Sequence, residues 1–274
     1  MTVRDALVEA AEALEQAGCP SPLVDAEWLL AHVLGVNRSE LYTIEPELRE
    51  GMIGRFGELV ERRANREPLA YVLGEWGFRR LTLAVDPRVL IPRPETEAVV
   101  DRCLALIEGV KEPRVLDVGI GSGAIALALA DERPDALVVG TDVSPDALEV
   151  AEENRVRAGV DGRVRFVLGD LLAGERGPFD LVVSNPPYVS AQELAGLEPE
   201  LQREPCWALV GDGAHEAVAR AAGGALARGG ALVFEVGDGQ AATVAELLER
   251  LGYDEVRVSP DLAGRDRIVD ARRR

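Results

Sequence analysis

The sequence predicts an α/β protein in which an open, mainly parallel sheet carries helices on both faces, preceded by a small helical bundle. After residue 112, short apolar strands alternate with helical stretches, which is the pattern of a parallel sheet. Before residue 70, apolar side chains recur at helical spacing instead. Between them, the alternating stretch LTLAV stands among turn formers and indicates a β-hairpin. We therefore expect a helical domain (1–70), a hairpin linker (71–90) and an α/β domain (91–274).

The N-terminal helices have clear start and stop signals. Thr2 can cap a first helix, and Gly18 ends it. Ser21 and the proline after it open a second helix, which ends at Gly35. A third helix is expected from Glu47 to about Asn65, although three glycines weaken it.

Seven apolar segments predict the strands of the sheet. They are 115–118, 137–141, 164–168, 179–184, 231–236, 255–259 and 267–270.

Composition limits the possible functions. The chain has 274 residues and a net charge of −18, which disfavours binding to a phosphate backbone. No apolar run is long enough to span a bilayer, and the N-terminus lacks the features of a signal peptide. The three cysteines form no closely spaced pair, which favours reduced thiols. We expect a cytoplasmic monomer that binds neither membrane nor nucleic acid directly and holds no metal.

A glycine-rich turn follows the first predicted strand. In DVGIGSGA, glycines stand at 119, 121 and 123, where they permit a tight turn and close approach of a ligand. The spacing differs from the dinucleotide fingerprint that seats a pyrophosphate on a helix. Asp117, just before the turn, disfavours phosphate and suits an ammonium group, such as that of S-adenosylmethionine. We expect the loop residues Gly119, Ile120, Gly121, Ser122 and Gly123 to bind this cofactor.

Acidic residues end the next two strands. Asp142 can accept hydrogen bonds from both ribose hydroxyls of a nucleoside. Asp170 can accept one from the adenine amino group, with Leu171 against the ring. Either aspartate alone could be only a helix cap, but acids at the ends of successive strands meet at the edge where such sheets bind ligands.

The fourth strand ends in Asn185-Pro186-Pro187-Tyr188. Two prolines cannot continue a central strand, and they present carbonyl groups instead of donors. The Asn185 carbonyl and the Pro186 carbonyl can accept the two hydrogens of an –NH2 group, and Tyr188 offers a face for stacking. An amide nitrogen, a poor nucleophile, could thereby be aligned with a sulfonium methyl group without a general base. The motif predicts methylation of an amide or amine nitrogen.

These motifs resemble those of class I methyltransferases with a Rossmann-like sheet. Further stretches are similar to the bacterial peptide chain release factor glutamine methyltransferases, and the resemblance covers essentially the whole chain. They are EPLAYVLGEWGF (67–78), LIPRPETE (90–97), NPPYVS (185–190), REP and AL (203–209) and GRDRIV (264–269).

The resemblance implies a seven-stranded sheet with a reversed last strand. It implies transfer of a methyl group from S-adenosylmethionine to the side-chain nitrogen (N5) of the glutamine in the Gly-Gly-Gln motif of class 1 release factors, leaving S-adenosylhomocysteine and modulating translation termination. Asn185, Pro186 and Tyr188 would be catalytic, and Asn185 would also contact the cofactor. Pro187 would help hold the glutamine, and Ile91, Pro92 and Arg93 would help close the site.

Two positions depart from the family pattern. Ile120 replaces a smaller residue, and we expect its side chain to point into the protein. Leu171 replaces an aromatic residue that can occur there, so adenine would be held by apolar contact without stacking.

Three other functions remain open. A glutamine methyltransferase of a ribosomal protein is chemically close. A DNA adenine-N6 methyltransferase shares the NPPY logic but needs a basic DNA-reading surface. A non-catalytic nucleoside-binding module would not need Asn185.

Overall fold

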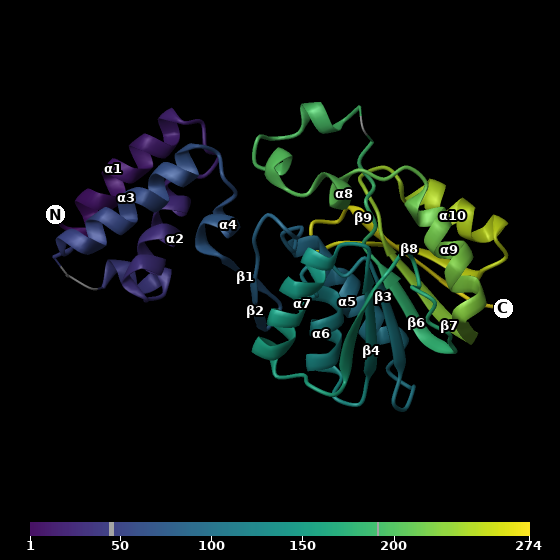
Figure 1. Ribbon diagram of the computed structural model, residues 1–274. Helices are drawn as coiled ribbons and strands as arrows, with labels where there is room; N and C mark the ends of the chain where they lie inside the picture. The colour runs from purple at the N-terminus through teal and green to yellow at the C-terminus, as the bar shows by residue number, and fades with distance from the viewer. Residues whose placement is uncertain (44–46, 191) are drawn as a thin grey trace. The chain divides into compact units, whose positions relative to one another are not determined.

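The computed structural model describes residues 1–43, 47–190 and 192–274, which form two compact units (Figure 1). The first unit contains Met1–Gly74 and Glu198–Arg203. The second contains Glu75–Leu197 and Glu204–Arg274.

The first unit is a helical bundle. Its α-helices pack around Leu14, Leu29 and Leu30, which are fully buried. The elements are α1 (Val3–Gln16), α2 (Pro22–Leu34), η1 (Arg38–Tyr42), α3 (Glu50–Ala64), α4 (Leu69–Leu73) and η3 (Leu201–Arg203).

The helix ends mostly follow their sequence signals. Thr2 caps α1 in a reciprocal box, in which its hydroxyl accepts from Asp5 N at 3.1 Å and its own N–H donates to the Asp5 carboxylate. Gly35 ends α2 in the left-handed conformation, with φ at 67°. Ser21, however, makes no side-chain cap bond, and the proline at the first turn of α2 supplies the start signal. The third helix begins at Glu50, later than predicted.

A buried ion-pair network ties this unit together. The Arg63 side chain, 4% exposed, donates to Asp25 at 2.8 Å and to Glu200 at 2.7 Å. Arg66 makes a second pair with Glu200 at 2.6 Å. The bundle thereby holds the segment around Glu200, which is distant in sequence.

The second unit contains the predicted sheet. Its seven strands run in the order β5-β4-β3-β6-β7-β9-β8, and β9 alone runs in the opposite direction to the other six. The fold class, with one reversed strand that comes last in the chain, is confirmed. The strands are β3 (Arg114–Val118), β4 (Leu137–Asp142), β5 (Val164–Leu168), β6 (Phe179–Ser184), β7 (Leu226–Glu235), β8 (Asp254–Pro260) and β9 (Asp266–Arg272).

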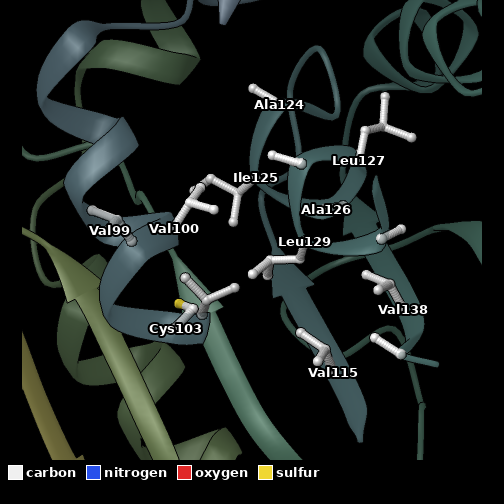
Figure 2. Close-up of a cluster of buried hydrophobic side chains, with 14 of the residues drawn as sticks. Val99, Val100, Cys103, Val115, Ala124, Ile125, Ala126, Leu127, Leu129 and Val138 are labelled. Atoms are coloured by element: carbon white, nitrogen blue, oxygen red, sulfur yellow. The ribbon is translucent and has the colours of Figure 1, made fainter. Parts of the chain in front are cut away.

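Helices cover both faces of this sheet (Figure 1). One apolar cluster joins α5 and α6 to the sheet, and Figure 2 shows Val100 and Ile125 from these helices near one another. A second cluster joins α9 and α10 to the opposite side chains of the same strands. The helices of the unit are α5 (Pro94–Leu106), α6 (Ala124–Glu132), α7 (Pro145–Ala158), η2 (Leu194–Gly196), α8 (Cys206–Leu209), α9 (Ala214–Ala225) and α10 (Ala241–Arg250).

The predicted hairpin is present but starts later than residue 71. Pro68 and Gly74, whose φ is 78°, bracket the short helix α4. The paired strands are β1 (Glu75–Phe78) and β2 (Leu81–Ala84), and they belong to the second unit.

Candidate active site

The glycine-rich turn joins β3 to α6 at the carboxyl edge of the sheet. Gly119, Gly121 and Gly123 all have positive φ, at 77°, 51° and 84°, so the turn requires glycine at these positions. Gly123 forms the N-cap of α6. Ile120 is buried and contacts β4, where a Cβ added to Gly140 would lie 2.5 Å from Ile120 Cγ2. The Ile120 side chain therefore points into the protein, as expected.

Asp117, at the base of this turn, is a buried carboxylate with an unused acceptor. Its Oδ2 accepts from Ala126 N at 3.0 Å, whereas Oδ1 has no hydrogen-bond partner in the described part of the chain. Burial raises the pKa of Asp117 to about 7, and nearby Asp142 adds to the rise. A buried unpaired oxygen is costly, so the position fits a cationic ligand.

Asp142 links two loops through its carboxylate. Oδ2 accepts from Gly121 N at 3.0 Å, and Oδ1 accepts from Ser144 N at 2.9 Å. Each carboxylate oxygen still has acceptor capacity for another donor. Asp142 therefore orders the glycine-rich turn and can also accept hydrogen bonds from the hydroxyl groups of a ligand.

A cavity of about 300 Å³ opens beside these residues, at the point where strand order reverses between β3 and β6. It is large enough for most of a nucleoside-type ligand. Of the predicted site residues, it is lined by Gly119, Gly121, Asp142, Asp170, Leu171, Asn185, Pro186 and Pro187. Sequence reasoning missed further lining residues, among them Arg88, Val89, Leu90, Trp207 and Ala208.

A second, smaller cavity of about 50 Å³ shares Gly119, Gly121 and Asn185 with the first. Asp117 also lines it, so the unpaired carboxylate belongs to the same site. The other predicted residues around it are Ile91, Pro92, Arg93, Ile120 and Ser122.

Glu204 fixes the loop that carries Ile91 and Arg93. The Glu204 side chain is 2% exposed, accepts from Ile91 N at 3.0 Å and pairs with the Arg93 guanidinium. Arg93 is thus already paired within the protein. Glu204 was not predicted as a site residue, although it is the acidic residue of the REP stretch.

The NPPY segment follows β6 and is held in place by contacts with Gln240 and Gly211. Gln240 Nε2 donates to the Tyr188 carbonyl at 2.9 Å. On the other side, Gly211 packs so closely that a Cβ there would lie 2.6 Å from Pro187 Cγ. Asn185 lines both cavities, and Pro186 is buried beside it. The segment is therefore held by fixed contacts.

Two of the predicted site residues, Gly123 and Tyr188, line neither cavity. Tyr188 is partly buried, and burial followed by the nearby Glu235 raises its pKa to about 12. Tyr188 thus stays a neutral phenol at physiological pH.

Glu235, at the end of β7, is the second acid that sequence reasoning missed. It is fully buried and accepts from Thr96 Oγ1 at 2.6 Å. Burial raises its pKa to about 7. The available signal was its place in VFEVG, because an acid that ends a central strand lies at the edge of the sheet that binds ligands.

The two histidines contribute no proton acceptor to the cavities. His215 is buried, its Nε2 contacts the Glu235 carbonyl at 3.0 Å, and burial lowers its pKa. His32 lies on α2 in the first unit.

Within the described ranges, no group of three His, Cys, Asp or Glu side chains could hold a metal ion. No helix of the described chain is long and apolar enough to cross a membrane.

Two family models match the chain. The PrmC N-terminal domain matches residues 5–74, and the methyltransferase small domain matches residues 100–236.

Curated relatives match along the full length. A release factor glutamine methyltransferase from Deinococcus radiodurans is 46% identical over 100% of this chain and 99% of the relative. One from Moorella thermoacetica is 42% identical over the same shares.

Solved structures share the fold. The 16S rRNA N2 G1207 methyltransferase RsmC of T. thermophilus, solved with AdoMet and guanosine, has a TM-score of 0.55 at 21% identity and covers 73% of this chain and 50% of its own. The catalytic domain of hMettl16, solved with an RNA hairpin, has a TM-score of 0.58 at 18% identity, covering 79% and 80%. The fold, the glycine-rich turn beside an NPPY segment and the full-length relatives agree, and the chain belongs to the release factor glutamine methyltransferase family.

Proposed function

We propose that the chain transfers the methyl group of S-adenosylmethionine to the side-chain amide nitrogen of the glutamine in the Gly-Gly-Gln motif of class 1 release factors. One observation carries the proposal. Asn185 lies where the two cavities meet, so one residue can face both a nucleoside-type cofactor and an amide acceptor. The names of the full-length relatives supply the identity of the acceptor.

The residues present fit the cofactor. The unpaired Oδ1 of Asp117 is suited to the cationic amino group, and Asp142 retains acceptor capacity for ribose hydroxyls. Asp170 and Leu171 line the same cavity and are assigned to adenine. When bound, S-adenosylmethionine supplies an electrophilic methyl group on a sulfonium centre.

The acceptor amide is handled by the NPPY segment. The two N–H groups of the glutamine amide would donate to the Asn185 side-chain carbonyl and to the Pro186 carbonyl. These two hydrogen bonds would direct the lone pair of the amide nitrogen away from both carbonyls. Gly211 and Gln240 keep the segment in place, so little reorganisation is needed. The carbonyls position the nitrogen without removing its proton, and proton loss follows methyl transfer.

The remaining assignments rest on the same family membership. We assign substrate recognition to the helical region 1–70, a linking role to 71–90 and catalysis to 91–274. The Ile91–Arg93 loop, fixed by Glu204, would border the glutamine. The protein would act in the cytoplasm as a monomer, without direct nucleic-acid contact.

The proposal is tested by formation of S-adenosylhomocysteine in the presence of a purified release factor. Wild-type protein should form it only when the release factor is added. Asn185→Ala should keep the cofactor dissociation constant within about tenfold while lowering kcat by about 10²-fold or more. Turnover of the variant close to wild type would contradict the positioning role.

A further inference from the structure

Glu235 and Asn185 are neighbours on adjacent parallel strands. Phe234 of β7 pairs in register with Ser184 of β6, so Glu235 and Asn185 each come one residue after a paired position. Adjacent strands are about 4.8 Å apart, which brings the two side chains within reach of each other. Asn185 also lowers the pKa of Glu235 through its side-chain amide.

Only one of the two oxygens of the Glu235 carboxylate accepts a hydrogen bond at ordinary distance from a described residue. Thr96 Oγ1 donates to its Oε2 at 2.6 Å, whereas Oε1 has no partner at ordinary hydrogen-bond distance within the residues that the structure covers. Glu235 is fully buried and Thr96 is 4% exposed, so water does not readily replace the missing donor. An unpaired buried carboxylate oxygen is costly, and it therefore favours a nearby amide N–H.

Asn185 has the complementary requirement. Its side chain has one carbonyl and one –NH2, and rotation by 180° exchanges them. Only one orientation presents the carbonyl to an acceptor amide. An acceptor on the opposite side would select that orientation.

We propose that Glu235, held by Thr96, is a positioning residue that accepts a hydrogen bond from Asn185 Nδ2 and so directs Asn185 Oδ1 toward the methyl acceptor. The inference rests on the proposed function, because it concerns how the same site orients its glutamine.

Other charged groups surround Glu235. Glu95 of α5 raises its pKa, and Arg267 of β9 lowers it. Tyr188 lies close enough for Glu235 to raise the phenol's pKa, and the His215 ring contacts the Glu235 backbone carbonyl. Neither Thr96 nor Asn185 titrates. Among these groups, Glu235, whose pKa burial raises to about 7 and which the Asn185 amide faces, is therefore the carboxyl through which pH would act on Asn185.

Variants of Glu235 separate orientation from packing. Glu235→Ala should lower kcat by about 10²-fold, because the acceptor amide loses its alignment, while the cofactor dissociation constant stays within about tenfold. Glu235→Gln keeps an acceptor oxygen and should retain kcat within about tenfold. Glu216→Gln, on the exposed surface of α9, is the matched control and should leave kcat unchanged.

The pH profile adds a readout that a structural role would not move. At saturating cofactor and release factor, wild-type kcat should fall by up to about tenfold as pH drops below about 7, since protonation leaves only a weaker, neutral acceptor for the Asn185 –NH2. Glu235→Gln should not show this fall in kcat at low pH, which we call the acid limb of the profile. Persistence of an unchanged limb in Glu235→Gln would overturn the inference.

Thr96 supplies a second pair of variants in case Glu235→Ala fails to fold. Thr96→Val removes the hydroxyl and should lower kcat by roughly tenfold and move the acid limb to higher pH. Thr96→Ser keeps the hydroxyl and should restore both. If Thr96→Val and Thr96→Ser had the same kcat and the same dependence of kcat on pH, the proposed role of Thr96 and Glu235 would be refuted.

An NMR measurement requires no substrate. The side-chain –NH2 of Asn185 should exchange its hydrogens with water faster in Glu235→Ala than in wild type. Equal exchange would contradict the Asn185–Glu235 bond even if the release factor is methylated. Slow exchange in wild type without methylation of a release factor would instead contradict only the proposed substrate.

Discussion

Gly211→Ala tests whether the NPPY segment must be held in place. An added Cβ would lie 2.6 Å from Pro187 Cγ, 2.8 Å from the Pro187 carbonyl oxygen and 2.9 Å from Pro187 Cβ. Ordinary carbon contacts are about 3.5–4.0 Å, so Pro187 must move by about 1 Å. Neither a proline ring nor a backbone carbonyl can rotate away as a flexible side chain would.

The expected loss follows from this displacement. A misplacement of about 1 Å in a catalytic group can cost about 10²-fold in rate. Gly211→Ala should therefore lower kcat by about that factor, measured as S-adenosylhomocysteine formation with saturating release factor. The backbone of Gly211 itself needs no left-handed conformation, since it is absent from the positive-φ residues of the described chain.

Gly224→Ala is the matched control. Gly224 lies in α9, and a Cβ there would meet no atom within 4 Å. Alanine should stabilise the helix by up to about 1 kcal/mol and leave kcat unchanged. Wild-type kcat in Gly211→Ala, with the fold intact by circular dichroism, would refute the claim that Pro187 is rigidly placed.

Three further predictions concern binding and stability. Asp142→Ala should weaken cofactor binding by at least about tenfold in calorimetry, because it removes a hydrogen-bond acceptor and frees Gly121 N; an unchanged dissociation constant would mean that the ribose assignment is wrong. Arg63→Met should lower the free energy of unfolding in urea by about 3–5 kcal/mol, since it leaves buried carboxylates unpaired; a loss below about 1 kcal/mol would contradict this. The pKa of Glu235 is raised from its ordinary value of 4.5 to about 7, so its contribution to stability should be complete below about 4.5 and lost as pH rises through about 7. The free energy of unfolding of wild type, measured relative to that of Glu235→Gln, should therefore fall across that window, and a constant difference would count against a raised pKa.

The fold could be predicted closely because its signals are local and agree with one another. Alternating strands and helices, with Gly35 as a left-handed helix stop, appear directly in the sequence and in the structure. The short helix α4 was missed because five residues carry too little periodicity to be distinguished from the adjoining strand pattern.

The site could be predicted only where one segment carries the signal. The glycine-rich turn and NPPY are contiguous motifs, and the structure brings most of their residues to the two cavities. Glu235, Glu204 and Gly211 act through contacts with residues far away in sequence. Such contacts depend on strand order and loop packing, which local spacing does not specify.

The most direct test of the account is tandem mass spectrometry of a purified class 1 release factor after incubation with the enzyme and S-adenosylmethionine. We expect one added methyl group, located by fragmentation on the side-chain nitrogen of the Gly-Gly-Gln glutamine and absent when Asn185→Ala replaces wild type. A methyl group on any other residue, or equal labelling by Asn185→Ala, would contradict it.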